Sequence, residues 1–97
     1  MDSYKEHYRI VSVTSSATRT SLRKLVDAVY TAKSQTPPRG KVFWVRLDPS
    51  AAIEVSDAYL EDARTISSVT EFEVMDALDN LYIENVATVF VEIKYAE

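Results

Sequence analysis

The side chains that could do chemistry in this 97-residue chain are few and poorly placed. His7 is the single histidine, and there is no cysteine, so no thiolate nucleophile exists for a histidine to activate. A serine nucleophile would have to come from ordinary serines, because no nucleophile-elbow motif is present. The single glycine excludes a glycine-rich phosphate-binding loop. We therefore expect a protein that is not an enzyme and that uses no cofactor or small-molecule substrate.

Carboxylates crowd one segment of the second half of the chain, at Asp57, Glu61 and Asp62. Three acidic side chains within six positions could form a carboxylate pair or a weak calcium site. Their spacing does not match a calcium-binding loop of the helix-loop-helix type. A solvated acidic face accounts for them better, and we expect no metal site.

Charge divides sharply along the chain, although the net charge is −4. Residues 1–46 hold nine Lys and Arg against three Asp and Glu, a balance of +6, whereas residues 47–97 hold two against twelve, a balance of −10. Either the two halves neutralise each other within the fold, or faces of opposite sign favour ordered docking onto a neighbour. Nucleic-acid binding is not expected, since the acidic half would repel phosphate and no RNA-binding signature is present.

The first half of the chain predicts a strand followed by a helix. Residues 7–14 are rich in β-forming side chains. From there the apolar residues recur at helical spacing, which predicts one amphipathic helix over about residues 20–34, capped by Thr18 or Thr20. The prolines and the glycine of residues 36–40 end it in a surface loop.

Residues 42–48 predict a central strand, because Phe43, Trp44 and Val45 make both of its faces apolar. The turn at residues 48–50 then predicts a hairpin with a strand over residues 51–56. Residues 57–68 are polar and poorly periodic, and we expect an irregular excursion there.

Residues 70–85 allow two interpretations. A helix would align Phe72, Met75, Leu78 and Tyr82, whereas two strands would alternate apolar and acidic residues around a turn at residues 79–80. We favour the strands. Residues 89–95 alternate strictly and predict a last strand, joined to residues 81–84 as a hairpin.

The predicted fold is therefore a single domain, residues 1–97, of the mainly β class: a small antiparallel β-sandwich with one amphipathic helix. The alternative, with a helix in place of the strands at residues 70–85, is an α+β ferredoxin-like fold in the order β-α-β-β-α-β. No apolar run approaches the ~18 residues that would span a bilayer, so no membrane contact is expected. The first ten residues lack a cationic segment followed by an apolar run, so we expect no secretory signal.

The order of these segments resembles a group of small structural proteins of tailed-phage particles. The resemblance lies in an opening strand with a Ser/Thr-rich segment (residues 11–22), a basic strand ending in Leu-x-Pro (38–49), an Ile-x-Val strand (53–56), and a closing Asn-Leu-Tyr-Ile with an alternating strand (78–95). The sequence departs from the pattern in having Ser56 and Asp57 where glycine is usual, and in a longer helix than expected.

The resemblance implies a structural component of a bacteriophage virion, either a capsid decoration or minor capsid protein or a tail-associated protein, made in the host cytoplasm. Its partners would be the major capsid or tail protein and copies of itself in a homo-oligomer. Aromatic anchors would be Tyr59 or Trp44, although the neighbours of Trp44 favour a place in the core. The charged contacts would come from Arg19, Arg23 and Arg39 against Glu61, Asp62, Glu71 and Glu73 of a facing copy. The ferredoxin-like alternative would instead be a regulatory or inhibitor module that binds one protein partner.

Overall fold

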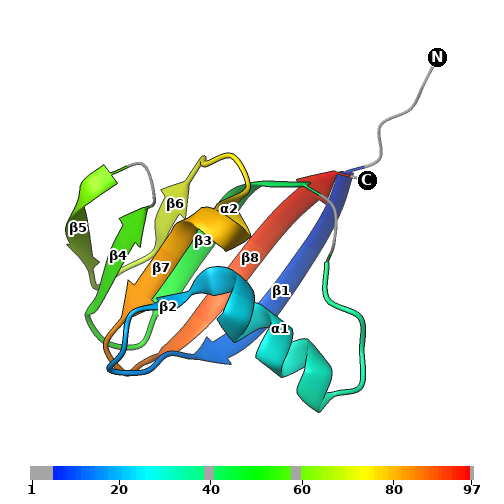
Figure 1. Ribbon diagram of the computed structural model, residues 1–97, viewed down its shortest axis with the longest axis horizontal. Coiled ribbons are helices and arrows are strands. Elements are labelled where there is room, and N and C mark those ends of the chain that lie inside the picture. Colours follow the sequence, from blue (N-terminus) through cyan, green and yellow to red (C-terminus); the bar gives the residue numbers. More distant parts are fainter. Residues whose placement is uncertain (1–5, 39–40, 58–59, 97) are drawn as a thin grey trace.

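Two antiparallel four-stranded sheets face each other in the computed structural model, which describes residues 6–38, 41–57 and 60–96 (Figure 1). Sheet A has the order β1-β8-β3-β6, with bounds Glu6–Thr14, Thr88–Ala96, Lys41–Pro49 and Thr70–Phe72. Sheet B has the order β2-β7-β4-β5, with bounds Thr20–Ser21, Leu81–Glu84, Ile53–Asp57 and Leu60–Ile66. The prediction of a mainly β antiparallel sandwich is confirmed.

The core forms because alternate residues of each strand are apolar and point between the two sheets. In β8 this inward row is Val89, Val91, Ile93 and Tyr95, all buried. Sheet B contributes Ile53, Val55, Leu81 and Ile83 from the other side. These side chains belong to one core cluster. The Cα radius of gyration of 13.0 Å is that of a single compact unit of about this length.

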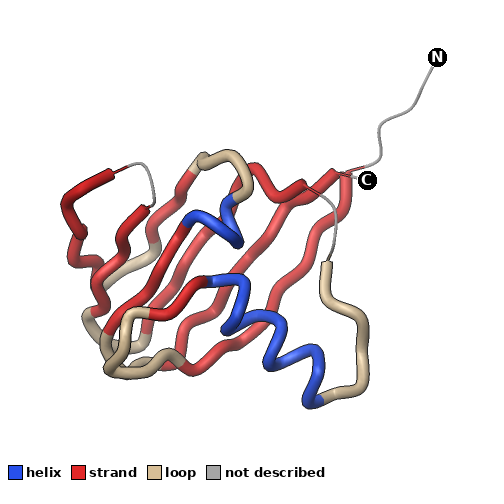
Figure 2. Tube along the Cα trace, in the orientation of Figure 1, coloured by secondary structure: helices blue, strands red, loops and turns tan. Residues whose placement is uncertain are grey.

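The helix α1, Leu22–Ala32, continues the layer of sheet B and covers β1 (Figure 2). Its apolar stripe turns inward as predicted, with Leu22 and Val26 buried. The N-cap is Ser21, whose Oγ accepts the Lys24 N–H at 3.2 Å, so the predicted caps Thr18 and Thr20 are wrong. Residues 20 and 21 form β2 instead of the first turn of the helix.

The interpretation of residues 70–85 as strands is confirmed, and the ferredoxin-like alternative is wrong. β6 and β7 fall in this segment, and between them lies α2, a single helical turn at Ala77–Asn80. Asp76 precedes α2 in the left-handed region, with φ of 52°. Ala77 and Leu78 are fully buried, so this turn closes one end of the core.

Three predictions of local pairing are wrong. The strands β3 and β4 are consecutive but belong to different sheets, so the predicted turn at residues 48–50 does not close a hairpin. Asp48 and Pro49 still pair with β8, and the chain passes to the other layer after Pro49. The strands β7 and β8 likewise belong to different sheets and form no hairpin. Residues 57–68, predicted to be irregular, contain β5, which pairs with β4 along the edge of sheet B.

Within the described ranges, no helix combines the length and the apolar character needed to cross a bilayer. His7 lies in β1, where its ring stacks on Tyr95 with centroids 5.0 Å apart.

Candidate protein interface

A β-bulge in β3 decides which side chains reach the outer face of sheet A. Val42 pairs with Tyr95 and Trp44 pairs with Lys94, so Phe43 is an extra residue without a partner on β8. An extra residue in one strand reverses the facing of everything beyond it. Val42 and Val45 can therefore both be buried, while Phe43 is exposed and Trp44 only half-buried. The predicted place of Trp44 in the core is wrong.

Trp44 is held on the outer face by its neighbours on both sides. Its Nε1–H donates to Oε1 of Glu71 on β6 at 3.0 Å. On the other side, Nζ of Lys94 lies 4.5 Å from the indole centroid, within the range of a cation–π contact. Since a surface aromatic fixed in one orientation loses little entropy on binding, Trp44 has the properties of an interface anchor.

A groove of about 630 Å³ lies beside Trp44. Phe43, Trp44 and Met75 supply its apolar walls, and Met75 is 74% exposed. Charged side chains of both signs also line it, namely Glu71, Glu73 and Lys94. An apolar wall with a charged border is a composition common in protein-binding surfaces.

The centre of the same face carries a charged cluster. Glu92 on β8 accepts hydrogen bonds from Arg46 on β3 and from the hydroxyl of Tyr8 on β1. The hydrogen bonds from Arg46 and then Tyr8 lower the pKa of the Glu92 carboxyl. Donation to the same carboxylate raises the pKa of Tyr8. These three strands are thus locked together on their solvent side by one carboxylate.

Exposed apolar side chains surround this cluster. Ile10 on β1 is directly opposite Glu92 and is 61% exposed. Phe90 on β8 is 52% exposed. Ile10 and Phe90 lie on the same face of sheet A as Tyr8, because they belong to neighbouring positions of the paired strands β1 and β8. Apolar side chains grouped around a polar centre mark an interaction surface more often than scattered single ones do.

The structure separates the residues that the sequence assigned to charged contacts. Glu71 and Glu73 both line the groove beside Trp44. Arg19 lies on the outer face of sheet B, where its guanidinium stacks 4.0 Å from the Tyr82 ring centroid and its Nε donates to Ser56. Arg19 and Glu71 therefore lie on opposite faces of the sandwich.

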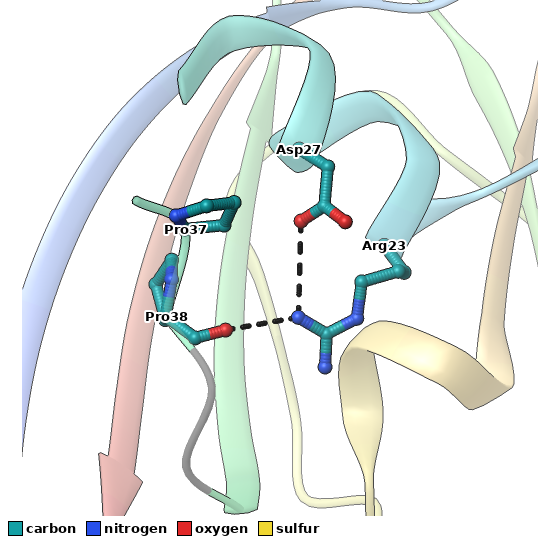
Figure 3. A pocket seen from close by; sticks show the side chains of 4 residues that line it. All are labelled: Arg23, Asp27, Pro37 and Pro38. Carbon is teal, nitrogen blue, oxygen red and sulfur yellow. Dashed lines mark hydrogen bonds and ion pairs between the residues drawn. The ribbon is translucent and has the colours of Figure 1, made fainter. Parts of the chain in front are cut away.

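Arg23 is engaged within the molecule. Its guanidinium faces both carboxylate oxygens of Asp79, at 3.2 and 3.3 Å, and joins α1 to α2. The same side chain donates to the carbonyl of Pro38 at 2.9 Å and lies 3.8 Å from Asp27 (Figure 3). This side chain organises the cavity of about 300 Å³ between α1 and the loop after it. Arg39 and Tyr59, and the side chains of Glu61 and Asp62, lie outside what the structure describes.

The sequence did not single out Phe43, Met75 or Lys94 as groove residues. The run from Phe43 to Val45 predicted a strand with two apolar faces, and large apolar side chains such as Phe43 and Met75 are more often buried than exposed. Their exposure depends on the bulge in β3 and on the link from β6 to α2, and neither has a local sequence signal. Among the described residues, no three His, Cys, Asp or Glu are grouped closely enough to hold a metal ion.

In comparisons with known proteins, no family model, no curated protein and no solved structure matches this chain. The resemblance to tailed-phage structural proteins therefore stays a prediction from the sequence.

Proposed function

We propose that this chain is a structural protein that acts through protein–protein contacts made by the outer face of sheet A. The observation that carries the proposal is the grouping of exposed Tyr8, Ile10 and Phe90 with the half-buried Trp44 around one charged cluster. A face of this composition, left uncovered, favours association with another protein.

The proposed setting is a bacteriophage particle, where the chain serves as a capsid decoration, minor capsid or tail-associated protein. The order of the β-segments supports this setting, through the resemblance to such proteins. A small rigid sandwich also suits it physically. A protein present in many copies gains affinity through multivalency, so each contact can be modest while the assembly holds firmly. The partners are the major capsid or tail protein and further copies of the chain.

Quantitative mass spectrometry of purified particles tests the setting. The expected result is many copies of this chain in each particle. Particles that lack the chain would remove the virion assignment.

Charge introduced into the outer face of sheet A tests the surface. Ile10→Lys combined with Phe90→Glu should abolish incorporation into particles, because both side chains are exposed on this face. The matched control is Glu84→Lys on β7, which alters sheet B and should leave incorporation unchanged. Thermal unfolding of both variants should stay close to that of the native chain, because Ile10 and Phe90 are exposed and Glu84 lies outside the buried core, and surface substitutions change stability by about 0.5 kcal/mol or less.

A further inference from the structure

The strand β6 ends sheet A with an open edge. Val45, Arg46 and Leu47 of β3 pair with its three residues on one side. On its other side, the described residues provide no backbone partner. Alternate N–H and C=O groups of an edge strand point away from the sheet, and such a row can pair with an added strand.

Two pockets flank this edge, one on each face of β6. The outer pocket is the 630 Å³ groove beside Trp44. The inner pocket, of about 240 Å³, opens between the sheets and is lined by Val55 and Leu81 of sheet B together with Phe72. Glu71, Glu73 and Val74 line both pockets, so the two meet at the edge itself.

Sheet B extends past this edge. Figure 1 shows β4 and β5 reaching beyond β6, which is the last strand of sheet A. The guanidinium of Arg64 on β5 lies 5.3 Å from the ring centroid of Phe72 and spans the opening between the sheets. A further strand of sheet A, added beside β6, would therefore lie opposite the inner side of β5.

We propose that an extended segment of another protein adds to β6 as a fifth strand of sheet A. Successive side chains of a strand point to opposite faces, so the segment would place one side chain in the inner pocket and the next in the outer groove. Main-chain hydrogen bonds to β6 supply affinity, and the two pockets supply selectivity. This proposal rests on the proposed function, and it names the kind of partner that the groove accepts.

The charges around the edge select a basic segment. Glu71 and Glu73 line both pockets. The nearby cations are Arg64 and Lys94, which lie over aromatic rings, and Arg46, which is paired with Glu92. Glu73 differs from these groups, because no described cation forms an ion pair with it and it lines both pockets. A segment that alternates apolar residues with Lys or Arg complements both the pockets and the charge.

Amide chemical-shift mapping with a defined probe tests the proposal. The probe is a short labelled peptide of alternating lysine and valine, and a peptide of alternating glutamate and valine is its control. The basic peptide should bind the native chain and shift the amide signals of residues 70–74 and the indole signal of Trp44. The acidic peptide should not bind up to about 1 mM, because repulsion by the edge carboxylates opposes it.

Charge reversal supplies the matched variants. Glu73→Lys should weaken binding of the basic peptide about tenfold or more, equivalent to about 1.4 kcal/mol. Glu84→Lys, an identical change on β7, should alter it by less than about twofold, because Glu84 lines neither pocket. Glu73 is exposed and follows β6, so its replacement leaves the pairing with β3 in place.

Three results would overturn the proposal: no binding of the basic peptide, shifts that map to another edge such as β1, or equal weakening by the two reversals. Incorporation into particles separates this proposal from the proposed function. Particles that take up Glu73→Lys as well as the native chain would contradict the role of β6 and leave the structural role intact. If particles lack the native chain but the basic peptide binds at β6, the role of β6 is supported and the proposed function is contradicted.

Discussion

Ser15 and Ala87 exchange hydrogen bonds where the two sheets meet. The Ser15 N–H donates to the Ala87 carbonyl at 2.9 Å, and the Ala87 N–H donates to Oγ of Ser15 at 3.1 Å. The Ser15 hydroxyl in turn donates to the carbonyl of Asn85 at 2.5 Å. Asn85 has a φ of 89°, so this serine fixes a turn that most residues avoid. One buried side chain thereby holds the link from β7 in sheet B to β8 in sheet A.

Ser15→Ala should destabilise the fold by about 1–3 kcal/mol, because it leaves the buried Ala87 N–H without its acceptor. Urea unfolding followed by circular dichroism measures the change. The neighbouring Ser16→Ala is the control, since Ser16 is exposed and bonds within its own turn. Equal costs for the two substitutions would show that Ser15 does not hold this link.

The fold class could be predicted because it depends on periodicity. The alternation of residues 89–95 and the helical stripe from Leu22 to Tyr30 each bury the face that the pattern indicated. The pairing of strands could not be predicted in the same way. β3 and β4 are adjacent in the chain, and the Asp-Pro-Ser sequence at the end of β3 suits a hairpin, yet the two strands enter different sheets. Tertiary packing overrides such local turn preferences.

The candidate interface was harder to predict for one physical reason. Sequence reasoning placed Phe43, Trp44 and Val45 together in the core, because three successive large apolar residues suit a strand buried on both faces. Because of the bulge at Phe43, the side chains of Phe43 and Trp44 do not point into the core. A single inserted residue has no compositional signature here, so the aromatic groove became visible only with the pairing of β3 and β8.

Two valines close together in the chain should differ widely in their contribution to stability. Val89 is fully buried, whereas Val86 is 65% exposed. Val89→Ala should cost about 2 kcal/mol through lost burial and the cavity left behind. Val86→Ala should change the free energy of unfolding by about 0.5 kcal/mol or less. Chemical denaturation measures both, and similar costs would contradict the inward facing of β8.

The fluorescence of Trp44, the single tryptophan, should report the charges beside it. Nζ of Lys94 lies 4.5 Å from the indole centroid, and the guanidinium of Arg46 lies 5.9 Å from it. Lys94 raises the local concentration of iodide at the indole, whereas Glu71, which accepts the hydrogen bond of the indole N–H, lowers it. Lys94→Gln should lower the iodide quenching constant by about twofold at low salt and leave quenching by neutral acrylamide unchanged.

Lys33→Gln is the control for that measurement, because it removes the same charge at the end of α1, away from the groove. Its iodide quenching should equal that of the native chain. A tryptophan shielded from both iodide and acrylamide would place Trp44 in the core and remove the groove as a binding surface.

The pH dependence of stability should reveal the cluster around Glu92. Hydrogen bonds from Arg46 and Tyr8 lower the pKa of this carboxyl in the folded chain below its ordinary value of 4.5. A carboxyl whose folded pKa is depressed stabilises the fold above the unfolded pKa, and that contribution disappears as the pH falls through the folded pKa. Glu92→Gln should therefore destabilise the protein most at neutral pH and progressively less below pH 4.5.

A double-mutant cycle isolates this effect from other acidic groups. In the Arg46→Leu background the largest cause of the lowered pKa is gone, so the pH-dependent part of the Glu92→Gln effect should shrink markedly. Urea unfolding of the four proteins from neutral pH to about pH 3 measures the coupling. A coupling between Arg46 and Glu92 that stays constant across this range would mean that Glu92 keeps an ordinary pKa in the folded chain. The outer face of sheet A would then be held together by the strands alone, and the charged centre of the proposed interface would be free to rearrange around a partner.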